Sequence, residues 1–161
     1  MTINQALTLA KKIMNNHTEL RYWNVTLNNR KRSFGVCSYG KQEIQLSSLL
    51  IPVMTDEAIK DTIIHEIAHA LCPQHHHDYV WQAKCIELGG NGQRCGGADK
   101  YKEGNEGMKE CQEKLAKYTM TCPCCGNKGY KNRRPTSARS CGICSPYSYN
   151  EKFKLVLTQN Y

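Results

Sequence analysis

The chain has 161 residues and a formal net charge of +8, with ten cysteines and six histidines. This length fits one domain, or a small domain with an appendage. The N-terminal stretch meets Lys11 and Lys12 early, and no later segment is apolar for long enough to cross a bilayer. We therefore expect an intracellular protein without a membrane partner, located in the cytoplasm, on the nucleoid or in the nucleus. We also expect a monomer. Cysteines in such a reducing compartment favour metal binding over disulfides.

The first part of the chain alternates between helix and strand patterns. Apolar residues at helical spacing predict a helix over 3–16, and alternation predicts a strand over 20–27. A basic turn at 28–32 leads into two short strands, over 33–39 and 43–47. These patterns predict a small sheet between helices.

The next segment contains His65-Glu66-Ile-Ala-His69 in a helical pattern, and Thr55 has the character of its N-cap. Residues four apart lie one above the other on a helix, so both histidines can bind one metal ion. Glu66 is displaced by one residue and is free to hold the proton of a metal-bound water. The arrangement is typical of a zinc peptidase, with His65 and His69 as ligands and Glu66 as the catalytic base.

A catalytic zinc takes a third protein ligand, and several residues can supply it. The candidates are His75, His76, His77 and the downstream carboxylate of Glu87. His75 has the metzincin spacing from the second histidine, although that pattern places a glycine where this chain has a cysteine. The residues alone leave the choice open.

Two further helices are predicted before the composition of the chain changes. A helix predicted over 78–88 is closed by two glycines, and a short helix is expected over 108–117. Cysteine pairs with few aliphatic residues then continue to a strand pattern at 153–157. We therefore expect a core domain of residues 1–116 and a separate subdomain of residues 117–161.

Two Cys-x-x-Cys pairs lie in this subdomain, separated by fifteen residues. The spacing is that of a tetrahedral zinc ribbon, which leaves Cys124 as a spare thiol. The predicted ligands of this structural zinc are Cys122, Cys125, Cys141 and Cys144. Together with the histidine site, two zinc ions per chain are expected. The remaining cysteines are expected to be ordinary buried or loop thiols: Cys37, Cys72, Cys85, Cys95 and Cys111.

The positive charge is concentrated in the same subdomain. Residues 117–161 hold eight basic residues against one acid, a formal +7, and four thiolates around Zn²⁺ lower this to about +5. Cations that follow phosphates, interleaved with aromatic faces for unstacked bases, are typical of single-strand binding. The candidate DNA-binding residues are Lys131, Arg133, Arg134, Arg139, Tyr130, Tyr147 and Tyr149.

The chain resembles the SprT-like family, which includes the Spartan proteases. That family follows His-Glu-x-x-His with His-Gly-x-x-Phe, and this chain has His77-Asp-Tyr-Val-Trp81, with Asp78 in place of the glycine. The family also places a Tyr-x-Cys-x-x-Cys-Gly zinc module after the protease core. This chain has Cys122-Pro-Cys-Cys125-Gly126, with the tyrosine displaced upstream to Tyr118. The resemblance implies His77 as the third ligand. It also implies a metal-dependent protease that binds DNA and degrades proteins crosslinked to it.

The expected fold is α+β: a small zincin-like metalloprotease core, with a short mixed or antiparallel sheet and helices, followed by the zinc ribbon. From zincin architecture, the strand at 43–47 is expected to hold an extended substrate by edge pairing. Two other functions stay open. One is a non-catalytic zinc protein that binds nucleic acid, which the presence of Glu66 opposes. The other is a zinc peptidase with no DNA role.

Overall fold

The computed structural model describes residues 1–94, 96 and 98–161, and their contacts divide the chain into two compact units, Met1–Met108 and Lys109–Tyr161. The division falls within helix α4 (Gly104–Leu115), whereas the sequence-based boundary at 116/117 lies just after that helix. The end of the helix is tied to the C-terminal segment. The Nδ2 of Asn160 donates to the Ala116 carbonyl, and the Tyr161 hydroxyl donates to the Leu115 carbonyl.

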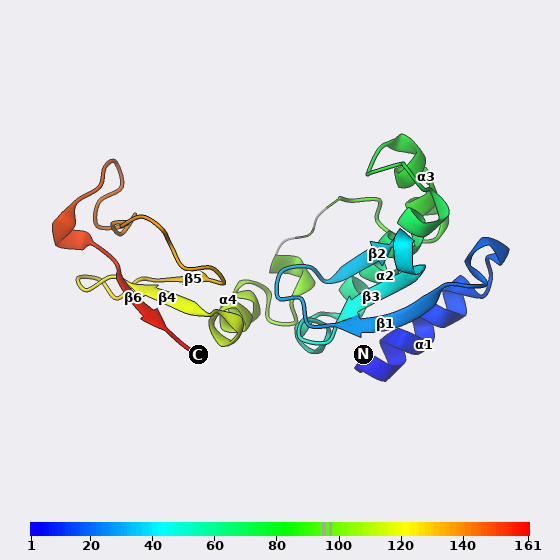
Figure 1. Ribbon diagram of the computed structural model, residues 1–161, viewed down its shortest axis with the longest axis horizontal. Helices are drawn as coiled ribbons and strands as arrows, with labels where there is room; N and C mark the ends of the chain where they lie inside the picture. The colour runs from blue at the N-terminus through cyan, green and yellow to red at the C-terminus, as the bar shows by residue number, and fades with distance from the viewer. Residues whose placement is uncertain (95, 97) are drawn as a thin grey trace. The chain divides into compact units, whose positions relative to one another are not determined.

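The sheet of the first unit contains β1 (Asn24–Asn28), β2 (Gly35–Ser38) and β3 (Glu43–Ser47), in the order β1-β3-β2 (Figure 1). Strand β3 pairs in parallel with β1 and antiparallel with β2, so both of its edges are hydrogen-bonded. The expectation that residues 43–47 bind substrate by edge pairing is therefore wrong. The strand of this sheet that packs against α2 and lies at an edge is β2.

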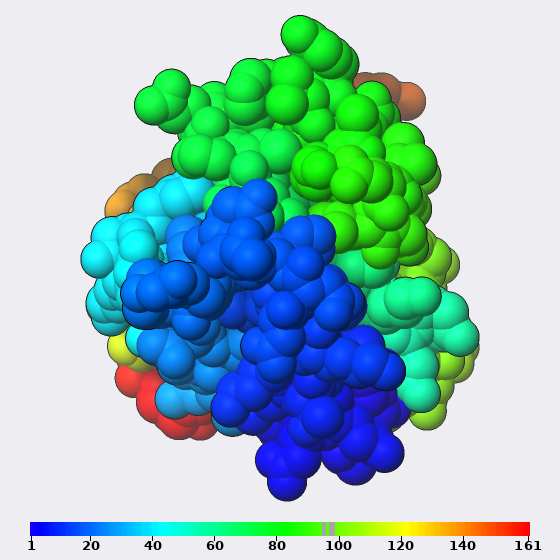
Figure 2. All heavy atoms as spheres, turned by 90° about the vertical axis from the view of Figure 1, so that its right-hand side faces the viewer, coloured from blue at the N-terminus to red at the C-terminus, as the bar shows by residue number. Residues whose placement is uncertain are grey.

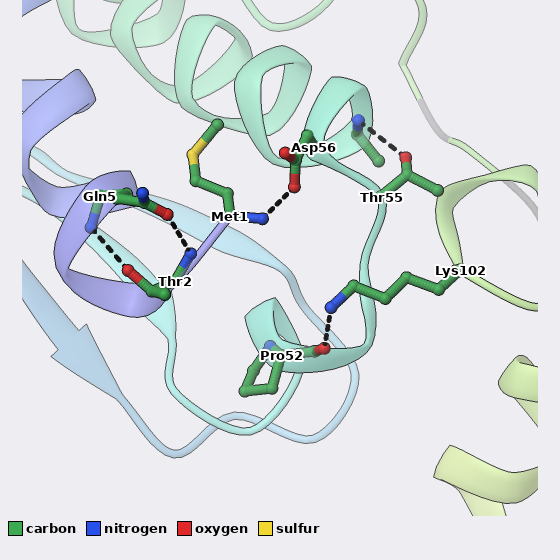
Figure 3. A network of polar contacts seen from close by, with 8 residues as sticks. Met1, Thr2, Gln5, Pro52, Thr55, Asp56 and Lys102 are labelled. Atoms are coloured by element: carbon green, nitrogen blue, oxygen red, sulfur yellow. Dashed lines mark hydrogen bonds and ion pairs between the residues drawn. The ribbon is translucent and has the colours of Figure 1, made fainter.

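Helix α1 (Ile3–Met14) lies on the surface of the first unit and packs against β1 and α2 (Figures 1 and 2). A capping box begins it (Figure 3). The backbone N–H of Gln5 donates to Thr2 Oγ1 at 3.2 Å, and the Thr2 N–H donates to Gln5 Oε1 at 2.7 Å. These bonds satisfy two donors that the helix end would otherwise leave without partners.

Helix α2 (Asp56–Leu71) is the centre of the core. The Thr55 hydroxyl caps it by accepting from the Ala58 N–H at 3.1 Å, as the sequence predicted (Figure 3). The helix packs against β2, β3, α1 and α3, and its isoleucines at 59, 63, 64 and 67 are all at most 1% exposed. Each buried aliphatic side chain of this size stabilises the fold by about 1.5–3 kcal/mol. Contacts on several sides therefore hold α2 rigidly in place.

Two strands begin later in the chain than their sequence patterns suggested. The pattern at 20–27 becomes a 3₁₀ turn followed by β1, because the Trp23 N–H donates to the Leu20 carbonyl. The pattern at 153–157 becomes β6 (Val156–Gln159), because the N–H of Phe153 donates locally to Asn150. Local turns satisfy these backbone groups, so they are not available to a sheet. No described helix combines the length and the apolar character needed to cross a membrane.

The second unit contains an antiparallel sheet of β4 (Tyr118–Thr121), β5 (Lys128–Lys131) and β6, in the order β5-β4-β6 (Figure 1). The first cysteine pair lies in the connection between β4 and β5. Gly126, which follows Cys125, has a φ of +72°, a left-handed conformation that favours glycine. With helices, a mixed sheet and this cysteine-bearing module, the α+β fold class is confirmed.

Candidate metal centres and active site

Three histidine side chains converge at the C-terminal half of α2. The Nε2 of His77 lies 3.1 Å from Nε2 of His65 and 3.1 Å from Nε2 of His69. The ligand atoms of all three lie within 4.8 Å of one another. A tetrahedral zinc with Zn–N bonds of about 2.0–2.1 Å needs nitrogens about 3.3–3.4 Å apart. The observed spacing is close to that requirement.

The protonation states of these histidines also suit a metal ion. Burial, followed by the neighbouring His69 charge, lowers the pKa of His65 to about 4. Burial, followed by the charge of His77, lowers the pKa of His69 to about 4. Both rings are therefore neutral at pH 7, and neutral imidazole is the form that binds metals. A neutral imidazole has only one N–H donor, so three converging ring nitrogens cannot all hydrogen-bond to one another. A cation bound between them satisfies all three.

His77 is aimed at the other two histidines by an unusual backbone conformation. Its φ is +61°, in the left-handed region that few non-glycine residues adopt. The following residue, Asp78, is the N-cap of α3 (Tyr79–Glu87) and accepts from the N–H groups of Val80 and Trp81, both at 3.1 Å. The aspartate that replaces the family's glycine thus stabilises the start of α3, which keeps His77 in place.

The alternative third ligands do not join this group. His75 Nδ1 contacts Asp78 Oδ2 at 2.7 Å, and Glu87 pairs with Lys84 at 2.6 Å. The ring of His76 is 6.2 Å from that of His69. Within the described residues, none of the three belongs to the histidine group. The geometry therefore favours His77 over the metzincin spacing.

This geometry predicts the effect of removing each histidine of the loop. His77→Ala should weaken zinc binding at the histidine site on the order of 10²-fold or more, because a direct ligand is lost. His75→Ala and His76→Ala are matched controls from the same loop and should change the affinity little. Competition with a chelator of known affinity measures the difference. A larger effect of His75→Ala would support the metzincin arrangement instead.

Trp81 forms a platform beneath the three histidines. Its ring centroid lies 4.7 Å from that of His65, 5.2 Å from that of His69 and 4.6 Å from that of His77. The side chain is 1% exposed and packs in a cluster with Ile64 and other buried residues. Contacts with one rigid indole restrict the orientations of all three imidazoles. The sequence indicated Trp81 only as the aromatic residue of the family pattern.

Glu66 is buried beside the histidines and held by β2. Burial raises its pKa to about 7, although the N–H of Cys37, which donates to the carboxylate, and the charge of Lys100 both oppose this. A Cβ on Gly35 would lie 2.7 Å from Glu66 Cγ and 2.9 Å from Oε1. Only a glycine at position 35 therefore lets β2 approach the Glu66 side chain so closely. A carboxylate with a pKa near neutrality can both accept and return a proton. No sequence motif pointed to Gly35 or to the Cys37 amide.

A cavity of about 300 Å³ opens over these groups. It is lined by residues 35–37 of β2, by Glu66, by the three grouped histidines and by the neighbouring His76. Tyr39 stands at its side, and its hydroxyl donates to the His69 carbonyl at 2.8 Å. The free edge of the sheet therefore borders the histidine group through β2.

The second candidate metal centre is formed by Cys122, Cys125, Cys141 and Cys144. The Sγ atoms of Cys122 and Cys144 are 3.9 Å apart, and those of Cys125 and Cys141 are 3.6 Å apart. Zinc with Zn–S bonds of about 2.3 Å places its sulfurs about 3.8 Å apart. Hydrogen bonding, first from the Cys144 N–H, lowers the pKa of Cys141 to about 6, whereas hydrogen bonding, first with Cys125, raises the pKa of Cys144, so the neighbouring thiols share their protons unequally. The four thiols therefore fit a structural zinc.

The other cysteines do not join either group in the described part of the chain. Cys124 is exposed beside the ribbon, Cys37 is half-buried, and Cys72, Cys85 and Cys111 are buried free thiols. Cys95 lies outside the described residues. Burial raises the pKa of Cys72, Cys85 and Cys111, which suits unreactive core thiols.

The candidate DNA-binding residues are spread over the second unit. Tyr130 and Lys131 lie on β5, and three exposed arginines follow it, Arg133, Arg134 and Arg139. Tyr147 is 98% exposed, and Tyr149 is 51% exposed with its hydroxyl donating to Glu151. Three other cations of this unit are paired, Lys114 with Glu110, Lys128 with Glu113 and Lys154 with Glu151. In the described chain the four candidate cations have no such partner.

Comparison with known proteins identifies the family of this chain. No curated protein matched the chain. A solved structure, the metallopeptidase zymogen abylysin of Pyrococcus abyssi, is 18% identical, with a TM-score of 0.43 over 71% of this chain and 91% of that one. The model of the SprT-like family matches residues 3–101, which include all three grouped histidines and Glu66. Because this match covers more than half of the chain, residues 3–101 form a SprT-like domain and the chain belongs to the SprT-like family.

Proposed function

We propose that this protein is a zinc-dependent endopeptidase that cleaves proteins bound or crosslinked to DNA. The observation that carries the peptidase is the placement of buried Glu66 beside three converging histidine nitrogens. A purely structural metal site has no use for a carboxylate at this position. Burying an ionisable group without a role is costly, which argues against the non-catalytic alternative.

Each residue of the site has a separate role in the proposed peptide hydrolysis. His65, His69 and His77 would hold the zinc, which polarises the scissile carbonyl and makes water a better nucleophile. Glu66 takes the proton of the attacking water and returns it to the leaving amine. The Cys37 N–H keeps the carboxylate in position. Backbone groups of the outer edge of β2 other than the Cys37 N–H can pair with an extended substrate, so that its peptide bond lies across the cavity.

The DNA role rests on the second unit. Its unpaired cations, Lys131, Arg133, Arg134 and Arg139, suit phosphate contacts, and the exposed Tyr147 offers a free ring face for an unpaired base. These features favour single-stranded DNA, or DNA with single-stranded character. Binding DNA would raise the local concentration of any protein fixed to the same strand.

Replacing both Arg133 and Arg134 by Ala should weaken DNA binding similarly for every sequence. The slope of log affinity against log salt should fall by about 1.4, because each lost single-strand contact contributes about 0.7.

Tyr147→Ala should cost about 1–3 kcal/mol of binding free energy with single-stranded DNA and less with duplex DNA, because only unpaired bases can stack on the ring. Fluorescence anisotropy at several salt concentrations measures both effects.

The matched control is the double change Lys11→Ala and Lys12→Ala, which removes two exposed cations from the first unit. It should leave DNA affinity nearly unchanged. In a cleavage assay, the Arg133 and Arg134 changes should lower the rate for a DNA-bound protein relative to the rate for a free peptide. Equal loss of both rates, or binding that salt does not affect, would leave a peptidase with no DNA role.

A further inference from the structure

We propose that the active-site cleft selects substrates with an acidic side chain next to the cleaved bond, bound between Arg32, Arg94 and Lys100. This inference rests on the proposed peptidase and concerns which peptides it cleaves. The three cations line a cavity of about 250 Å³, and the same cavity is walled by Thr62, His65 and Glu66.

The position of this cavity determines which residue of a substrate can place its side chain there. His65 and Glu66 line both this cavity and the one over the histidine group. A side chain in the cavity therefore belongs to a residue very close to the peptide bond that Glu66 serves. Gly35 of β2 lines both cavities as well, so a strand paired along that edge would direct its side chains into them.

The charge in the cavity is unbalanced. Lys100 is 9% exposed, and its Nζ lies 3.4 Å from Oδ2 of Asp61, whose other oxygen accepts the N–H of Asn91 at 2.9 Å. This ion pair is long, so Asp61 offsets the charge of Lys100 only in part. Arg32 and Arg94 are exposed, and neither forms an ion pair within the described residues.

Positive charge therefore dominates the cavity wall around Glu66. A carboxylate entering between the three side chains gains charge-assisted hydrogen bonds, and the guanidinium groups can bind it with two bonds each. A lysine or arginine would meet like charges in a partly enclosed site, where they are poorly screened. An acidic side chain fits this chemistry best.

The test uses peptides that differ only at the two residues flanking the cleaved bond, with Asp, Ala or Lys at each. The wild-type protein should show a kcat/KM about tenfold higher for Asp than for Ala, and lower still for Lys. Arg32→Glu and Arg94→Glu should each lower the Asp-to-Lys ratio at least about fivefold. Arg30→Glu is the matched control, because Arg30 is exposed in the same turn and does not line the cavity. A wild-type ratio near one, or ratios unchanged by both reversals, would overturn the proposal.

Binding separates this inference from the peptidase itself. The Glu66→Gln protein should bind a fluorescent Asp peptide more tightly than its Ala counterpart, and adding Arg32→Glu should remove the difference. If the wild type cleaves no peptide but this preference remains, the proposed reaction fails and the acidic pocket stands. Absence of the preference overturns the pocket. A single-stranded oligonucleotide that displaces the Asp peptide, with the displacement lost in Arg32→Glu, would assign the cations to phosphate and also overturn it.

Discussion

Glu66→Gln should retain zinc at the histidine site and lose proteolysis by a factor of roughly 10² to 10⁴. Glutamine keeps the size of the side chain and can still accept the N–H of Cys37, so the packing against β2 should survive. It cannot accept the proton of the attacking water. Zinc quantification and a peptide-cleavage assay on the same preparation give the two readouts.

Two controls make this result specific. Glu57→Gln alters an exposed acid in the first turn of the same helix and should leave cleavage unchanged. His65→Ala should lose both zinc and cleavage, since it removes a ligand. If Glu66→Gln cleaves peptides as fast as the wild type, Glu66 is not the base and the proposed reaction is wrong.

Removal of one ribbon cysteine should have the largest effect on folding. Cys122→Ser or Cys141→Ser should reduce the zinc content from two ions to one and unfold the second unit. The buried apolar side chains there are few, namely Cys111, Ala116, Met120 and the two cysteines themselves. Structural zinc contributes about 10–16 kcal/mol of apparent binding free energy in small domains, far more than so small a core supplies.

Hydrogen exchange resolved along the chain measures this outcome. Protection should be lost in residues 118–159, which hold β4, β5 and β6, and kept in α2 of the first unit. Cys124→Ser is the matched control, because Cys124 is an exposed cysteine two residues from Cys122 and lies outside the metal group. Retained protection in the Cys141→Ser protein would show that the sheet folds without zinc.

Local patterns in the sequence were enough to indicate several parts of the molecule. The helical spacing of His65 and His69, the Thr55 cap and the paired cysteines each depend on residues within a few positions of one another. Helix geometry and turn geometry act over that range, so residue type and spacing carry the information. The SprT-like family, expected from the resemblance of the motifs, and the α+β class, expected from the helix and strand patterns, are both confirmed.

The identity of the strand beside the active site could not be read in this way. Zincin architecture suggested the strand at 43–47, yet this strand lies in the middle of its sheet, and β2 lies at the edge. Strand order depends on pairing between distant segments, and the alternation of a single strand does not encode it. The roles of Gly35 and of the Cys37 amide follow from the same packing of β2 against α2.

Among the loop histidines the family resemblance implied His77, and the tertiary structure supplies the physical reason. His75, His76 and His77 are chemically identical neighbours, so residue type cannot distinguish them. In the structure, His75 bonds to Asp78, and the left-handed backbone at His77 turns its imidazole toward His65 and His69 above Trp81. The position of α3 relative to α2 decides this, and it results from burial of residues far apart in the chain. Spacing therefore identified the two histidines on one helix, and packing between helices placed the third beside them.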